Sequence, residues 1–110
     1  MVQSITPEFS VSPQLEAPAM AQAAAAGFRS VINNRPDFEG GPDQPTSAAM
    51  EAAALAAGLQ YRYLPVNGAY QSPEEIAAFR ALLDSLPKPI LAFCRSGARS
   101  TRLFNAALAL

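Results

Sequence analysis

Short apolar runs alternate along the chain with longer segments whose composition favours helix. The runs that read as strands cover residues 2–12, 28–33, 61–64 and 90–93. The segments that read as helices cover residues 18–26, 47–57, 72–86 and the chain after residue 100. Because strands and helices alternate, we expect right-handed crossovers. The predicted fold class is therefore α/β, with three layers and a mostly parallel central sheet flanked by helices.

Local signals mark the ends of these elements. Gly27 and Gly58 follow two alanine-rich helical segments, and glycine commonly terminates helices. Ser72 is a predicted helix cap, because a proline and two glutamates follow it. Residues 36–46 contain three prolines, two glycines and three acids, which is typical of a loop within a domain. We expect residues 2–12 to supply one or two edge strands of the sheet.

Composition indicates one compact domain, residues 1–110, and argues against several classes of function. Hydrophobic residues make up 50% of the chain and charged residues 15%. The net charge of −1 leaves no broad basic field, so we expect no binding to nucleic acid. One cysteine and no histidine predict neither a disulfide framework nor a zinc site, and we expect no metal or cofactor.

The chain also lacks the sequence signals of a membrane or secreted protein. It shows neither a signal-peptide pattern at its start nor an apolar run of about 18 residues. We therefore expect no membrane association and a cytoplasmic location. The sequence leaves the oligomeric state open.

The stretch ILAFCRSGARSTR, residues 90–102, carries the main chemical signal. It reads as strand, loop and helix, which places Cys94 at the carboxyl end of a buried strand. The backbone N–H groups of residues 95–100 can surround an anion in front of the sulfur, and Gly97 supplies the backbone freedom for such a loop. The predicted anion-binding residues are Arg95, Ser96, Gly97, Ala98 and Arg99.

Cys94, Arg99 and Ser100 are candidate catalytic residues. Arg99 and the helix amino terminus favour the thiolate, which lowers the thiol pKa from about 8.5 toward neutrality and makes Cys94 a nucleophile. Ser100 is predicted either to cap the last helix or to donate a hydrogen bond to the sulfur or a leaving group. The alternative is an inert, buried cysteine, but the basic and hydroxyl residues around it favour a site.

Further polar residues should reach the same edge of the sheet. Asn34 and Arg35 follow the strand at residues 28–33, so they are predicted to line the pocket beside Cys94. Asn67 lies in the loop after the third predicted strand and is a further pocket-lining candidate. The acidic residues Asp37 and Glu39 could donate a proton there, or they could simply pair with Arg35 or solvent.

The segment CRSGARS resembles the active loop of cysteine-dependent phosphatases and of rhodanese-type sulfurtransferases. Together with SVINNRPDFEGGPDQP, residues 30–45, and YRYLPVNG, residues 61–68, it is similar to the phosphatase-like domain of the beta-lactamase hydrolase-like proteins. This family is often labelled a domain of unknown function or a candidate sulfur transferase. The resemblance implies a cysteine-phosphatase-like fold. It also implies that such a domain can belong to a longer chain fused to a metallo-hydrolase domain.

Two departures from the phosphatase pattern bear on the reaction. Cys94 and Arg99 enclose four residues, whereas the phosphatase signature has five and rhodanese-type loops have the shorter spacing. Dual-specificity phosphatases carry an aspartate about thirty residues before the cysteine, but residues 65–69 contain no acid. Asn67 can donate a hydrogen bond but cannot deliver a proton to a leaving group.

These departures set an order of preference among three hypotheses for the function of the chain. The first is a sulfurtransferase in which Cys94 accepts sulfane sulfur as a persulfide, because a stable anionic leaving group needs no acid. The alternative is a phosphatase that works through a phosphocysteine, with Asp37 or Glu39 replacing the missing acid. The third is a catalytically weak module that binds anions or a partner chain. In either enzymatic case the partner is a small anionic substrate, a sulfane-sulfur donor or a phosphoester.

Overall fold

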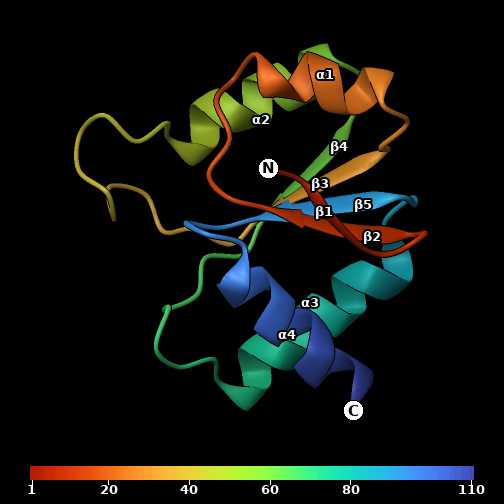
Figure 1. Cartoon of the computed structure of the whole chain (residues 1–110). Coiled ribbons are helices and arrows are strands. Elements are labelled where there is room, and N and C mark those ends of the chain that lie inside the picture. Colours follow the sequence, from red (N-terminus) through yellow and green to blue (C-terminus); the bar gives the residue numbers. More distant parts are fainter.

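A five-stranded sheet runs through the centre of the computed structural model, which describes residues 1–110 (Figure 1). The strands are β1 (Gln3–Thr6), β2 (Phe9–Ser12), β3 (Ser30–Asn33), β4 (Gln60–Tyr63) and β5 (Ile90–Phe93). Their order in the sheet is β1-β2-β5-β3-β4. Only the pairing of β1 with β2 is antiparallel, so the sheet is mostly parallel, as predicted.

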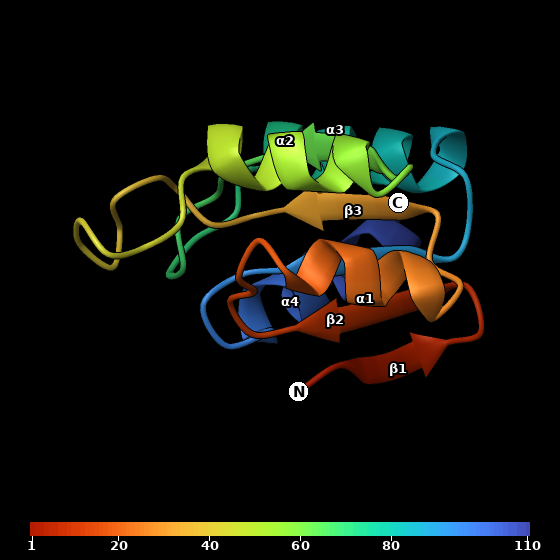
Figure 2. The ribbon, with the colours of Figure 1, turned by 90° about the horizontal axis from the view of Figure 1, so that it is seen from above.

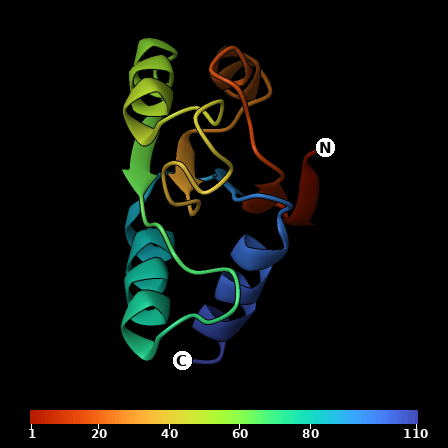
Figure 3. The ribbon, with the colours of Figure 1, turned by 90° about the vertical axis from the view of Figure 1, so that its left-hand side faces the viewer.

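Two helices cover each face of the sheet, as Figure 1 shows from the side and Figure 2 from above. Helices α1 (Ala19–Ala25) and α2 (Ser47–Ala56) pack side by side on one face, and α3 (Pro73–Ser85) and α4 (Ala98–Leu108) on the other. Viewed along the sheet, the molecule shows the three layers that the sequence predicted (Figure 3). None of these helices has the length and apolar character that crossing a membrane requires.

Strand β5 lies at the centre of the sheet and contributes to both halves of the core. Ile90 and Ala92 pack in the cluster under α3 and α4, whereas Leu91 and Phe93 pack in the cluster under α1 and α2. All four side chains are buried, because the two faces of the strand are both covered by helices. This double burial explains the continuous apolar run in the sequence.

Strand β2 corrects one prediction. The segment 2–12 was expected to supply edge strands, but only β1 lies at the edge, and β2 lies between β1 and β5. Phe9 and Val11 enter the core, and the alternating serines Ser10 and Ser12 are also buried. Small hydroxyl side chains fit under a covering layer, so an apolar and polar alternation did not mean a solvent-exposed face here.

Several element boundaries differ slightly from the prediction. Strand β3 begins at Ser30 rather than residue 28, and β4 ends at Tyr63, so Leu64 already belongs to the following loop. Helix α4 begins at Ala98, before Ser100. The predicted start of α3 is confirmed, because Ser72 and Glu75 form a reciprocal capping box.

The parallel register brings three strand ends to one edge of the sheet. Ser12, Phe93 and Asn33 lie side by side at the carboxyl ends of β2, β5 and β3. The chain stays in register one residue further. The N–H of Asn34 donates to the carbonyl of Phe93 at 2.9 Å, and the N–H of Cys94 donates to the carbonyl of Ser12 at 3.3 Å. Cys94 is therefore fixed between two neighbouring strands.

Candidate active site

Cys94 lies directly beyond β5, under the amino terminus of α4. Its side chain is almost fully enclosed, with 1% of the residue exposed. The backbone N–H of Gly97 donates to the sulfur at 3.0 Å. Gly97 has a φ of 96°, a left-handed conformation that glycine adopts readily, and this turn directs its N–H back to the sulfur. The loop after Cys94 therefore donates a hydrogen bond to the sulfur from the side on which α4 begins.

The surroundings of the sulfur favour the thiolate. Burial raises the pKa of the Cys94 thiol, but donors around the sulfur outweigh this effect and lower the pKa below its ordinary value. These donors are the backbone N–H and the hydroxyl of Ser100 and the backbone N–H groups of Gly97 and Ser96. The predicted direction of the shift is confirmed. The donors, however, are mainly loop N–H groups rather than the Arg99 side chain.

Ser100 does not cap α4. Gly97 occupies the cap position, and glycine has no side chain that could accept a hydrogen bond from the first turn. The free N–H groups of that turn and the helix dipole therefore remain available to an anion or to the thiolate. The Ser100 hydroxyl donates to Asn34 Oδ1 at 2.9 Å. One hydroxyl has a single proton, so the backbone N–H groups are the constant donors to the sulfur.

Arg99 is buried, and one edge of its guanidinium group is bound to Glu39. Nη1 donates to Glu39 Oε2 and Nη2 to Glu39 Oε1, both at 3.1 Å, and Nη1 also donates to the carbonyl of Val66 at 3.1 Å. Nε is buried and has no hydrogen-bond partner. An unpaired buried donor is costly, so this atom is where an additional acceptor would stabilise the site.

The loop between β4 and α3 packs directly on Arg99. A Cβ atom at Gly68 would lie 2.9 Å from Arg99 Nη2, so a larger residue would force the guanidinium group to shift. Arg102 Nη2 donates to the carbonyl of Gly68 at 2.6 Å and holds the loop in place. Residues 65–69, which include no acid, therefore lie against the candidate site.

Glu39 joins Arg99 to Arg35. Arg35 Nε donates to Glu39 Oε1 at 3.0 Å, so the two arginines share that carboxylate oxygen. Burial raises the pKa of the Glu39 carboxyl, but hydrogen bonds and charge from Arg99 and Arg35 outweigh it and lower the pKa. Glu39 is thus an ionised partner of two cations rather than a proton donor at neutral pH.

Asp37 is hydrogen-bonded at the start of α2. Its Oδ1 atom accepts a hydrogen bond from the N–H of Ser47 at 2.8 Å, at the amino terminus of α2. Its own N–H donates to the Tyr63 hydroxyl at 2.8 Å. A carboxylate in this position is stabilised by the α2 terminus. These two hydrogen bonds give Asp37 a structural role at the start of α2.

Neither predicted pocket-lining asparagine forms a hydrogen bond with the Cys94 sulfur. Asn34 is fully buried, accepts from Ser100 through Oδ1 and donates to the carbonyl of Leu64 at 2.9 Å. It lies beneath the site and ties α4 to the end of β4. Asn67 is exposed, and its Oδ1 accepts from the N–H of Ala69 at 2.7 Å, within its own loop. The full burial of Asn34 corrects the expectation that it lines an open pocket, whereas the lining role of the exposed Asn67 stays a prediction.

The remaining loop residues differ in exposure. Arg95, Ser96 and Ala98 are exposed, whereas Gly97 is buried against the sulfur. Ser96 Oγ accepts from the N–H of Ala98 at 3.3 Å, which shapes the turn before α4. The Arg95 side chain makes no hydrogen bond within the chain, so it is available at the rim to an incoming anion.

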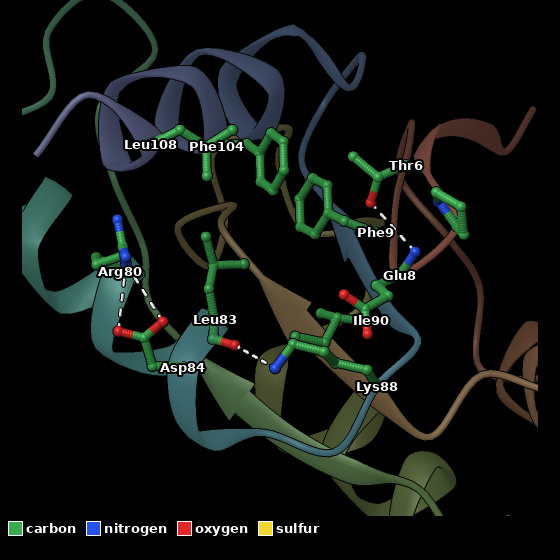
Figure 4. Close-up of a pocket in the computed structure, with 11 residues that line it drawn as sticks. Thr6, Glu8, Phe9, Arg80, Leu83, Asp84, Lys88, Ile90, Phe104 and Leu108 are labelled. Atoms are coloured by element: carbon green, nitrogen blue, oxygen red, sulfur yellow. Dashed lines mark hydrogen bonds and ion pairs between the residues drawn. The ribbon is translucent and has the colours of Figure 1, made fainter.

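Two cavities bear on the location of the candidate site. The larger of these two, of about 490 Å³, lies at the amino ends of β2 and β5, at the opposite edge of the sheet from Cys94 (Figure 4). Its floor contains the stacked rings of Phe9 and Phe104. A second cavity, of about 420 Å³, borders the outer side of the Cys94 loop at residues 96–98 and reaches Arg102. The thiol with a lowered pKa and its N–H donors are at Cys94, so the candidate site is at Cys94 and not at the larger cavity.

Comparison with known proteins gives the same fold and a family. The family described as "Beta-lactamase hydrolase-like protein, phosphatase-like domain" matches residues 1–110. A beta-lactamase hydrolase-like protein of Xylella fastidiosa is 35% identical over 103 residues, which is 94% of this chain and 24% of that protein. The chain thus spans about a quarter of the length of this relative.

Solved structures agree with this assignment. The crystal structure of a "putative phosphatase" from Neisseria meningitidis is 30% identical with a TM-score of 0.84, covering 92% of this chain and 71% of that one. A second "putative phosphatase", from Shewanella putrefaciens, is 23% identical with a TM-score of 0.83, covering 96% and 66%, and supports the fold. The chain belongs to the family of the phosphatase-like domain of beta-lactamase hydrolase-like proteins.

Proposed function

We propose that this chain is a cysteine-dependent phosphatase that hydrolyses phosphoesters through a phosphocysteine. The observation that carries the proposal is the Cys94 thiol, held with a lowered pKa among the N–H donors at the uncapped amino terminus of α4. The similarity to a phosphatase-like family supports phosphoryl transfer over other uses of a thiolate. This reverses the order of the two enzymatic hypotheses that the sequence suggested.

The proposed reaction has two displacements at phosphorus. The Cys94 thiolate attacks, the S–P bond forms, and the P–O bond to the leaving group breaks with its electron pair on oxygen. Water then attacks the phosphocysteine, the S–P bond breaks, and phosphate leaves as the thiolate is restored, while the proton of the water passes to solvent. The role of Arg99 and the loop N–H groups is to bind the phosphoryl oxygens in both steps.

The arrangement of acids restricts the substrates of such an enzyme. Asp37 is engaged at α2, Glu39 is ionised between two arginines, and residues 65–69 hold no acid. We therefore infer that none of these candidate acids protonates a leaving oxygen. We propose aryl phosphates as the substrate class, because an aryloxide departs without a proton whereas an alkoxide does not.

We expect aryl phosphate to be turned over roughly 10² to 10⁴ times faster than alkyl phosphate. Phosphate release from p-nitrophenyl phosphate and from glycerol phosphate measures the ratio. Asp37→Asn should change both rates by less than about threefold, like the control Asp43→Asn in the same loop. Comparable rates for both substrates, with the alkyl rate lost only in Asp37→Asn, would instead show that Asp37 is the acid.

Sulfur transfer is the second candidate, favoured by the four-residue spacing between Cys94 and Arg99 and by the lack of an acid. In that reaction the thiolate attacks the outer sulfur of thiosulfate, a new S–S bond forms, and sulfite leaves with the electron pair of the old one. A thiol acceptor then removes the sulfur from the Cys94 persulfide. The Gly97 N–H, at 3.0 Å from the Cys94 sulfur, is a suitable hydrogen-bond donor to the thiolate and to the persulfide anion.

Intact-mass spectrometry distinguishes these candidates. The phosphatase proposal predicts that rapid acid quenching of a reaction with aryl phosphate traps a phosphoryl group on Cys94. A single added sulfur atom after thiosulfate treatment, removable by cyanide, together with no phosphoryl adduct, would establish sulfur transfer instead. No adduct with either substrate would favour the third hypothesis, an anion-binding module without efficient chemistry.

A further inference from the structure

The side chains of Arg35, Glu39 and Arg99 form a connected chain that ends at the candidate site. Arg35 and Arg99 are each at least nine-tenths buried, and their hydrogen bonds to Glu39 range from 3.0 to 3.1 Å. Charge-assisted hydrogen bonds of this kind are short and directional, and a carboxylate that accepts from both Nη atoms fixes the plane of the guanidinium group. Glu39 therefore sets the orientation of Arg99.

Arg35 is itself held firmly. Its Nη1 atom donates to Gln14 Oε1 at 3.2 Å, and its Nε atom donates to Glu39. The backbone at Gly40 passes so close that a Cβ atom there would lie 2.6 Å from Arg35 Nη2. Arg35 also directly follows Asn34, whose N–H donates to the carbonyl of Phe93 at the end of β5, so Arg35 links the Glu39 carboxylate to the sheet. These contacts give the carboxylate one fixed position.

The Nε edge of the Arg99 guanidinium group is not bound to Glu39, and this free edge indicates why Glu39 holds the group in one orientation. Glu39 occupies Nη1 and Nη2, and Nε is left buried without a partner. Arg99 lies in the first turn of α4, next to Ser100, whose backbone N–H donates to the Cys94 sulfur. A substrate oxygen can pair with Nε without displacing Glu39, so an anion and the carboxylate bind to different edges of one guanidinium group.

We infer that Arg35 is a positioning residue of this site, which acts through Glu39 to hold Arg99 with its Nε edge free for the substrate anion. The inference rests on the proposed function for the identity of that anion, a phosphoryl group. It adds two residues, Arg35 and Glu39, that lie outside the Cys94 loop and about sixty positions before it in the chain. Arg35 itself does not touch the substrate.

Arg35→Gln should lower kcat/KM for p-nitrophenyl phosphate roughly 10- to 100-fold, because a misplaced guanidinium group binds the transition state less well. It should also weaken the binding of inorganic phosphate about tenfold, measured as protection of Cys94 against iodoacetamide. Arg35→Lys, which can still donate to Glu39, should recover part of both losses. Arg29→Gln, at an exposed arginine just before β3, is the matched control and should change neither.

A double variant tests whether Arg35 acts through Glu39. If it does, Arg35→Gln and Glu39→Gln each lower kcat/KM, and combining them costs little more than the larger single loss. Losses that multiply would overturn the inference and show that Arg35 acts on the anion independently. Tighter phosphate binding in Glu39→Gln would also overturn it, because Glu39 would then compete with the anion. Circular dichroism and urea unfolding confirm that each variant is folded.

The outcome for the inference is separable from that for the proposed function. A wild type that hydrolyses aryl phosphate, with equal phosphate protection in wild type and Arg35→Gln, overturns the inference alone. A wild type without hydrolysis, whose phosphate protection still weakens in Arg35→Gln and recovers in Arg35→Lys, overturns the phosphatase proposal and supports the positioning role. A wild type that shows neither hydrolysis of aryl phosphate nor phosphate protection of Cys94 overturns both.

Discussion

Replacing Cys94 with serine is expected to lower kcat for an aryl phosphate by about 10⁴-fold or more. The N–H groups of the loop lower the pKa of a thiol enough to give a thiolate, but a serine hydroxyl starts from a far higher pKa and stays protonated. The variant should fold, because a hydroxyl is smaller than a thiol and can accept the hydrogen bond from Gly97. Phosphate release and circular dichroism measure the two properties.

The chain offers a clean control for this substitution. Cys94 is its single cysteine, so iodoacetamide should label the wild type once and Cys94→Ser not at all. Labelled wild type should lose the same activity as the serine variant. A folded serine variant that retains activity within about tenfold of the wild type would show that Cys94 is not the nucleophile.

Arg99→Lys is expected to lower kcat/KM roughly 10²- to 10³-fold, although the charge is kept. A lysine has no planar fork, so it cannot bind both oxygens of Glu39 and also present the Nε edge to a substrate. Steady-state kinetics with p-nitrophenyl phosphate measure the loss. Arg62→Lys, at an exposed arginine of β4, is the matched control and should stay within about threefold. Equal effects of the two substitutions would contradict the role of the guanidinium fork.

Local sequence signals predicted the parts of the site that are local in space. The apolar run at residues 90–93, the small residues after it and the helix that follows are neighbours in the chain, and they lie together in the fold. The position of Cys94 and the direction of its pKa shift followed from that segment alone. The alternation of strands and helices likewise predicted the layers and the parallel sheet.

The side-chain network could not be predicted in the same way. From the sequence, Glu39 could be an acid or part of a simple ion pair, because its contact with Arg99 joins residues sixty positions apart. The only local signal was the spacing of four between Arg35 and Glu39. Asn34 looked like a pocket residue because it follows a strand end, but its amide satisfies backbone and hydroxyl groups beneath the loop. The direction in which a side chain points depends on tertiary packing, which the pattern of apolar and polar residues does not encode.

The pH dependence of Cys94 alkylation tests the central claim most directly. The rate of iodoacetamide labelling follows the thiolate fraction, and limited access to a buried sulfur scales the rate without moving its midpoint. The same chain unfolded in urea supplies the reference, with an ordinary thiol midpoint of about 8.5. We predict a midpoint for the folded protein that is clearly lower than this reference. A folded midpoint equal to or above the unfolded one would contradict the account of Cys94 as an activated nucleophile.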